Sequence, residues 1–181
     1  VIVGAGDTTG LRVARDLGEK GWQVVIGLLP GQEAPDADER FARVAMDPLS
    51  QPSMRAAAKA VDAPVDMLVL NIDPPCVDDE GTILAPLDTE ALRRCYDVCT
   101  VGPLRAINAF MPLLERGEGK RICLVTERNS SNNLCDDMAH YGVRTARAAL
   151  NMAFHLLFNG LRPRGYTFRA YCKDALSRDA G

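Results

Sequence analysis

The chain has 181 residues, of which 47% are hydrophobic and 25% are charged, so it is long and apolar enough to form one domain with a sizeable core. This composition excludes a disordered chain and a mini-protein. Its 21 Lys and Arg against 24 Asp and Glu give a formal charge of -3 and a pI near 5.4. That balance argues against a nucleic-acid partner.

The cysteines of the chain form no CxxC pair. The sequence has 6 of them, far apart, which predicts neither a disulfide framework nor a zinc site or any other metal centre. We therefore expect reduced thiols in a cytoplasmic protein. No apolar run approaches the roughly 18 residues of a membrane span, so no membrane partner is expected. The chain starts on an apolar strand without a Met, so either end can be truncated.

Strands and helices are expected to alternate along the whole chain. Residues 1–4 read as a strand, 11–20 as a helix that Gly21 ends, and 22–29 as a strand that is almost wholly apolar. Such continuous apolar character is typical of a parallel strand covered on both faces. Further strands are expected over 41–46, 65–71, 120–126 and 166–172, helices over 51–61 and 142–159, and a helical segment over 88–114 that is broken at Gly102-Pro103.

The connecting segments are polar. Residues 30–39, 74–86 and 128–141 are predicted as turns and loops, and the acids Asp73 and Asp78 to Glu80 are interpreted as solvated rather than metal-binding. Six strands then alternate with helices without a repeat or a linker. This order predicts a single α/β domain over 1–181: a doubly wound, Rossmann-type three-layer sandwich with a parallel sheet.

Glycines follow the first strand directly, in the segment Gly4-Ala-Gly6-Asp-Thr-Thr-Gly10. Glycine at such a turn lets the backbone approach a pyrophosphate, whose charge the helix N-terminus favours. The spacing fits neither GxGxxG nor GxxxGxG completely, because Thr9 stands at the third glycine of the first pattern and Thr8 at the second glycine of the other. We predict dinucleotide binding by these three glycines and two threonines; the alternative is a tight turn that binds nothing.

The choice between NAD and NADP stays open in the sequence. An acid near the end of the second strand would take the ribose hydroxyls, and an Arg there would accept the 2′-phosphate. The strand ends Gly27-Leu28-Leu29-Pro30, with neither residue. Asp47, after the third strand, is a candidate acceptor for an adenine amino group or a turn residue before Pro48.

Further motifs follow in a recognisable order. They are Leu70-Asn71-Ile72-Asp73-Pro74, Asp97 to Pro103 with Met111 to Leu114, Lys120 to Val125, and Ala148 to Met152. With the glycine turn and Asp47, they make the chain similar to the short-chain dehydrogenase/reductase family, especially its small carbonyl-reductase-like members, over essentially all 181 residues.

The resemblance implies an NAD(P)-dependent oxidoreductase that acts on a small carbonyl or alcohol substrate. It places Asn71 at the family's Asn-Asn-Ala-Gly segment and so adds this residue to the cofactor site. It also implies a homodimer or homotetramer built from the helices over 88–114 and 142–159.

The family's chemistry implies a Tyr acid/base, a Lys that lowers the pKa of that Tyr and holds the ribose, an orienting Ser and an Asn in a proton relay. A gapless count back from Ala148 places Arg147 at the Lys position and Val143 at the Tyr position. The same count puts Glu127 at the Ser position, and Cys99 stands at the Asn position. We therefore expect the usual tetrad to be replaced.

Three residues remain candidates for catalysis. Glu127 can donate a proton only in its neutral form, and a neighbouring cation favours the charged form. Tyr141 lies two residues before Val143, a rotation of roughly 200° on a helix, so a packing role competes with a catalytic one. Arg147 can contact a ribose or phosphate, or form a structural ion pair with Glu127.

The remaining Cys, His and Ser candidates can each be explained by a structural role. Cys99 reads as a small buried hydrophobe, His140 and His155 as packed or surface imidazoles, and Ser130 and Ser131 as turn residues that could also reach a substrate.

The end of the chain departs from the family. After the sixth strand Cys172-Lys173-Asp174 replaces Pro-Gly. The resemblance predicts a seventh strand and much of a substrate lid beyond the residues given, unless residues were dropped before Ser177. The hypothesis is an NAD(P)-binding oxidoreductase with a non-standard mechanism; the alternative is a non-catalytic, nucleotide-sensing or partner subunit.

Overall fold

One parallel sheet organises the chain in the computed structural model, which describes residues 1–33, 41–72 and 82–173. The strand order is β3-β2-β1-β4-β5-β6, and every neighbouring pair is parallel. The chain winds outward from β1 in one direction and from β4 in the other, which confirms the doubly wound topology. The strands are β1 (Ile2–Val3), β2 (Val25–Leu28), β3 (Ala42–Ala45), β4 (Met67–Leu70), β5 (Arg121–Thr126) and β6 (Thr167–Cys172).

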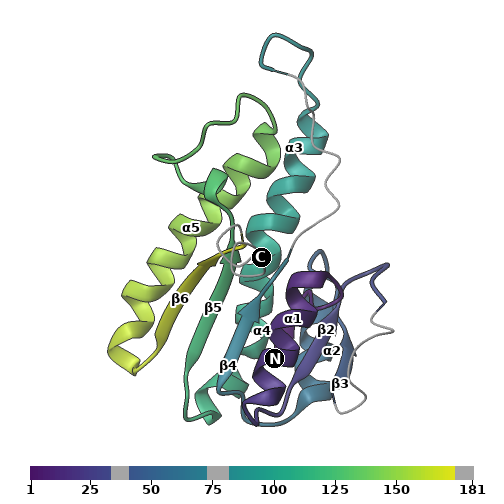
Figure 1. Ribbon diagram of the computed structural model, residues 1–181, viewed down its shortest axis with the longest axis vertical. Helices are drawn as coiled ribbons and strands as arrows, with labels where there is room; N and C mark the ends of the chain where they lie inside the picture. The colour runs from purple at the N-terminus through teal and green to yellow at the C-terminus, as the bar shows by residue number, and fades with distance from the viewer. Residues whose placement is uncertain (34–40, 73–81, 174–181) are drawn as a thin grey trace.

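Helices cover both faces of the sheet, as Figure 1 shows. Residues alternate along the strands, so Ile2 packs against α1 on one face while Val3 packs on the opposite face against the core that includes α2, α4 and α5. These layers confirm the three-layer sandwich. The helices are α1 (Thr8–Glu19), α2 (Gln51–Val61), α3 (Thr89–Tyr96), α4 (Gly102–Arg116) and α5 (Tyr141–Leu161), with short turns η1 (Asp97–Val101), η2 (Arg128–Ser130) and η3 (Arg162–Arg164).

Helix α1 begins three residues earlier than the apolar spacing predicts. Asp7 is its N-cap, in an extended conformation, and its side chain accepts a hydrogen bond from the backbone N–H of Gly10. The N-cap fixes the start of the helix without an apolar residue. The apolar pattern that begins at Leu11 marks only the face of α1 that packs against the sheet. The cap brings the helix N-terminus directly over the glycine turn.

The expected break at Gly102-Pro103 is wrong. The helix continues from α3 into α4 through η1, a π-helical turn in which the Gly102 N–H bonds the Asp97 carbonyl. Pro103 has no N–H to donate and would clash with the preceding turn of a regular helix. The wider turn accommodates that proline without ending the helix.

Two sequence assignments lie outside the described residues. They are the acid run at Asp73 and Asp78 to Glu80, and the C-terminal remnant around Ser177. Within the described ranges, no helix is long and apolar enough to cross a membrane.

Candidate dinucleotide and active site

The glycine turn after β1 is a position where side chains do not fit. Gly4 has a φ of 80°, and a Cβ there would lie 2.1 Å from the backbone oxygen of Asn71. A Cβ at Gly10 would lie 2.6 Å from the Cα of Ala5, so α1 packs directly on the turn. The sequence therefore needs glycine at both positions, because β4 and α1 pack directly on the backbone of the turn.

Asn71 ties the turn to the end of β4. The residue is 5% exposed, and its Nδ2 donates to the Gly4 carbonyl at 2.8 Å and to Asp7 Oδ1 at 2.9 Å. Asp7 Oδ1 also accepts from Gly10 N at 2.6 Å. A carboxylate thus sits at the N-terminus of α1, in the same turn as the predicted cofactor residues Thr8 and Thr9, which are the first two residues of the helix.

The chain leaves β2 through a tight turn. From the sequence, this place is notable only because it has neither the acid nor the Arg that would select a cofactor. Pro30 and Gly31 occupy its centre, Gly31 has a φ of 77°, and Gln32 N donates to Leu29 O at 2.9 Å. Pro followed by a positive-φ Gly is the signature of a type II turn. The turn directs Gln32 back over Gly6.

Gln32 contacts the glycine turn through its side-chain oxygen. Oε1 accepts from Gly6 N at 3.2 Å and from Leu29 N at 3.0 Å. A Cβ on Gly6 would lie 2.6 Å from the Cβ of Gln32, so the missing side chain of Gly6 makes room for this contact. Gln32 is a site residue that the sequence analysis missed; the Pro-Gly pair before it was the available signal.

A cavity of about 390 Å³ opens at the carboxyl ends of β2 and β3. Its lining includes Leu29, Gln32, Met46 and Asp47. Asp47 accepts from Leu49 N at 2.9 Å, so the turn interpretation of this residue holds while it also faces the cavity. The volume suits the adenosine part of a dinucleotide, and Gln32 connects this cavity to the glycine turn through its bond from Gly6 N.

A second polar cluster lies where β5 ends and α5 begins. Glu127 follows β5 directly, its side chain is 11% exposed, and three cations contact its carboxylate. Arg147 Nε lies 3.4 Å from Oε1, Lys173 Nζ lies 3.4 Å from Oε2, and Arg144 Nη1 bonds Oε1. The ion pair that the sequence allowed between Arg147 and Glu127 is therefore present.

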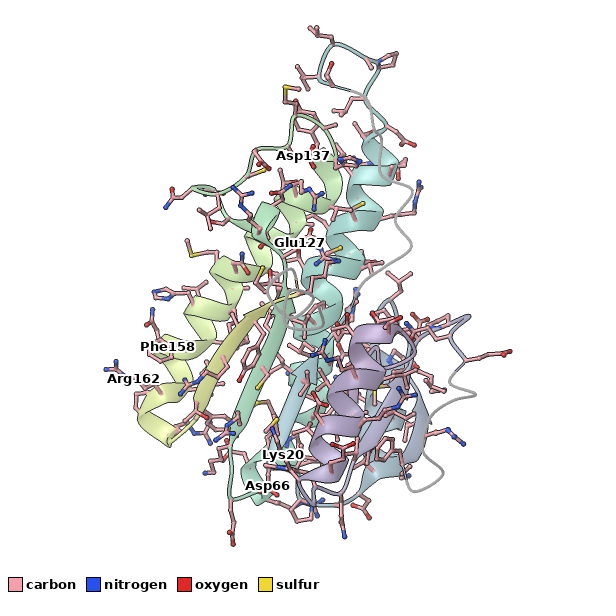
Figure 2. The ribbon with its side chains drawn as sticks, viewed as in Figure 1. Lys20, Asp66, Glu127, Asp137, Phe158 and Arg162 are labelled. Carbon is pink, nitrogen blue, oxygen red and sulfur yellow. The ribbon has the colours of Figure 1, made fainter. Side chains whose placement is uncertain are left out.

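Arg144 extends this cluster toward the start of α5. Its Nε donates to Asp137 Oδ2 at 2.8 Å, and His140 Nδ1 lies 3.1 Å from the same oxygen. The hydrogen bond from Arg144, joined by those from Ala139 and His140, lowers the pKa of Asp137 to about 2. Figure 2 shows Asp137 near the end of the molecule where α5 begins and Glu127 closer to the middle, with Lys20 and Asp66 at the opposite end. We call Glu127, Asp137, Arg144, Arg147 and Lys173 the Glu127 cluster.

The other two predicted tetrad positions, Cys99 and Val143, lie in apolar surroundings. Cys99 lies on η1, is 2% exposed and packs in a small apolar cluster with Cys95, Ala146 and Val143. Tyr141 is the first residue of α5 and is half-buried. The structure thus brings Cys99 and Val143 into one cluster and Glu127 and Arg147 into another.

Ser130 is a structural residue rather than an open substrate contact. It is 3% exposed, its Oγ bonds Thr126 Oγ1 at 2.8 Å and the Glu127 carbonyl at 2.7 Å, and Asn151 Nδ2 donates to it at 3.1 Å. These bonds hold the segment that carries Glu127. In the described part of the chain no group of three or more His, Cys, Asp or Glu is arranged to hold a metal ion.

Comparisons with known proteins agree with this architecture. Over 114 residues the chain is 35% identical to C-signal of Myxococcus xanthus, a short-chain dehydrogenase/reductase protein, covering 62% of this chain and 67% of that one. Over 159 residues it is 29% identical to 1-hydroxy-2-glutathionyl-2-methyl-3-butene dehydrogenase of Rhodococcus sp. (strain AD45), covering 84% and 66%. No family model matches the chain.

Solved structures share the fold. A short-chain dehydrogenase/reductase from Burkholderia multivorans with bound NADP superimposes with a TM-score of 0.76 at 19% identity, over 94% of this chain and 76% of that one. The fold and the curated relatives together show that this chain belongs to the short-chain dehydrogenase/reductase family of oxidoreductases. It spans about two thirds of the length of the curated relatives that it matches, 67% and 66%.

Proposed function

We propose that this chain is the NAD(P)-binding domain of a short-chain dehydrogenase/reductase whose site holds the dinucleotide but has no proton donor of its own among the tetrad positions. The observation that supports the lack of a proton donor is the Glu127 cluster, in which three cations contact one carboxylate. The proposal makes the protein a nucleotide-dependent binding partner or sensor rather than an ordinary reductase.

Dinucleotide binding is supported by the turn between β1 and α1. Gly4 and Gly10 let β4 and α1 pack closely on this turn, and the N-terminus of α1 favours a pyrophosphate. The cavity beside Asp47 is large enough for an adenosine. The structure from Burkholderia multivorans has the same fold and contains bound NADP.

Loss of the proton donor follows from the residue types. General acid catalysis needs a neutral acid within hydrogen-bond reach of the substrate. Three cations, Arg144, Arg147 and Lys173, contact the carboxylate of Glu127. Val143 and Cys99 pack together as apolar groups, and Arg147 is the cation beside Glu127 rather than a Lys beside a Tyr. A bound nicotinamide would supply a hydride, but these residues would not supply the matching proton.

Binding is tested by titrating the protein with NADH and NADPH and following reduced-nicotinamide fluorescence and the thermal unfolding midpoint. Thr8 is exposed at the first position of α1, so Thr8→Glu adds a charge that suits the helix but repels a pyrophosphate. We expect it to weaken binding at least tenfold without lowering stability. Thr89→Glu makes the same change at the first position of α3 and should leave affinity unchanged. No binding at millimolar cofactor would overturn the proposal.

An active oxidoreductase is the second candidate. It is favoured by the Rhodococcus relative, which is named a dehydrogenase. Hydride transfer comes from the cofactor, so a protein that positions both reactants can retain some rate while water, substrate or Tyr141 supplies the proton. Turnover of NAD(P)H against a panel of small carbonyl compounds distinguishes the two: cofactor binding without turnover supports the non-catalytic function.

Assembly into a homodimer or homotetramer is part of the proposal. Met152 and Leu156 on α5 are each 62% exposed, and Tyr96, at the end of α3, is also exposed. Large apolar side chains that recur on one helix support contact with a second copy. Sedimentation velocity of Leu156→Glu against the unchanged protein tests this, and identical monomeric profiles would contradict it.

A further inference from the structure

We infer that the dinucleotide pocket selects NAD(H) over NADP(H), with Gln32 and Asp7 as the residues that set the preference. The inference rests on the proposed function, because it concerns which dinucleotide enters the same pocket. Both residues lie at the glycine turn that follows β1. Gln32, from the turn after β2, contacts Gly6, and Asp7 is the next residue after Gly6 in the chain.

The amide of Gln32 has a defined orientation. Its oxygen already accepts from Gly6 N at 3.2 Å and Leu29 N at 3.0 Å, so the side-chain NH₂ is the group left to interact with a ligand in the cavity. An NH₂ donates well to a neutral ribose hydroxyl. It carries no charge to offset a phosphate, unlike the guanidinium that commonly accepts a 2′-phosphate.

A phosphate could compete for the two backbone N–H groups only by displacing Gln32 Oε1. The type II turn at Pro30 and Gly31 fixes the backbone of Gln32 through its N–H bond to Leu29 O at 2.9 Å. Displacement would therefore break two hydrogen bonds of a side chain whose backbone stays in place. A 2′-phosphate bound at these two N–H groups would carry this cost, whereas a ribose hydroxyl can accept from the Gln32 NH₂ without displacing the side chain.

The charges around the turn act in the same direction. Asp7 is held by Gly10 N and Asn71 Nδ2, Glu33 follows Gln32, and Asp47 lines the cavity. The cation among the described lining residues is Arg43. Among the described lining residues, the carboxylate of Asp47 and the guanidinium of Arg43 balance each other, so the lining has no net positive charge. A phosphate monoester adds a charge of about -1.5 to -2 at neutral pH, which this lining does not offset, so NADP(H) is disfavoured relative to NAD(H).

The experiment measures the dissociation constants of NADH and NADPH for the unchanged chain in one buffer, by calorimetry and fluorescence. We expect NADH to bind about five- to tenfold more tightly, the range that a few partly exposed charges give. Gln32→Arg replaces the neutral amide with a phosphate-binding group and should reverse the order. Asp7→Asn keeps a good helix cap while removing the charge, and should improve NADPH binding several-fold more than NADH binding.

Glu19→Gln is the matched control, because it removes one acid at the far end of the same helix, where Glu19 is exposed. It should leave the ratio of the two constants unchanged. Equal or tighter binding of NADPH by the unchanged chain would overturn the inference and leave the proposed function intact. Failure of both dinucleotides to bind would overturn the proposed function and the inference with it.

Discussion

Arg147 Nε lies 3.4 Å from Glu127 Oε1, and the two side chains are only 8% and 11% exposed. One residue is on α5 and the other follows β5, at the positions that the family resemblance assigns to a Lys and a Ser. Because the pair is so little exposed, water cannot solvate either charge well if the other is removed. We therefore expect this ion pair in the candidate active site to contribute to the free energy of unfolding.

Removing the central carboxylate should destabilise the protein. Glu127→Gln removes the carboxylate that Arg144, Arg147 and Lys173 share, and we expect a loss of about 3 kcal/mol in the free energy of unfolding, as for other broken buried ion pairs. Urea denaturation measures it. Glu90→Gln is the control, because Glu90 pairs with Arg93 at the surface and should change stability by about 0.5 kcal/mol or less. Equal effects of the two variants would contradict a buried role for Glu127.

Asp137 should make stability depend on pH in the acid range. Its pKa falls from an ordinary 3.8 to about 2 in the folded protein, mainly because Arg144 donates to it. A depressed carboxyl pKa contributes stability that is fully present above about pH 4 and is lost as pH falls toward 2. Asp137→Asn should therefore lower the urea midpoint at pH 7 and converge with the unchanged protein near pH 2. A difference that persists or grows at pH 2 would show that charge is not the cause.

Restoring the family's acid and cation should create or raise carbonyl-reductase turnover. Val143→Tyr with Arg147→Lys places a phenol and an ammonium four residues apart on one face of α5. The readout is NAD(P)H oxidation with a carbonyl panel, alongside cofactor affinity. Thr145→Tyr with Arg147→Lys is the control, because residue 145 is exposed and turned roughly 200° from residue 143. Equal rates for both double variants would show that the cleft itself differs.

Gly4 should be far less tolerant of a methyl group than Gly21, although both have positive φ values of 80° and 83°. A Cβ on Gly4 meets the Asn71 oxygen at 2.1 Å, whereas nothing lies within 4 Å of one on Gly21. Gly21→Ala should cost about 1 kcal/mol from backbone conformation alone. Gly4→Ala should cost roughly 3 kcal/mol or more because β1 or β4 must shift. Similar unfolding midpoints for the two variants would refute the close approach.

Much of the fold could be predicted from local patterns. The apolar runs and helical spacing located six strands and most helices, because burial on both faces of a parallel sheet imposes that pattern on the chain itself. Residues 102–103 show the limit: a Gly-Pro pair usually ends a helix, but packing of α4 against its neighbours kept the helix and widened one turn into η1.

The candidate site divides in the same way. The order of residues along the chain is enough to locate the glycine turn after β1 and the residue types at positions 99, 127, 143 and 147. That Gln32 contacts Gly6, and that three cations contact Glu127, follows from the folded arrangement of the chain. Those contacts join residues distant in sequence, and the sheet order and the turns at its carboxyl edge bring them together.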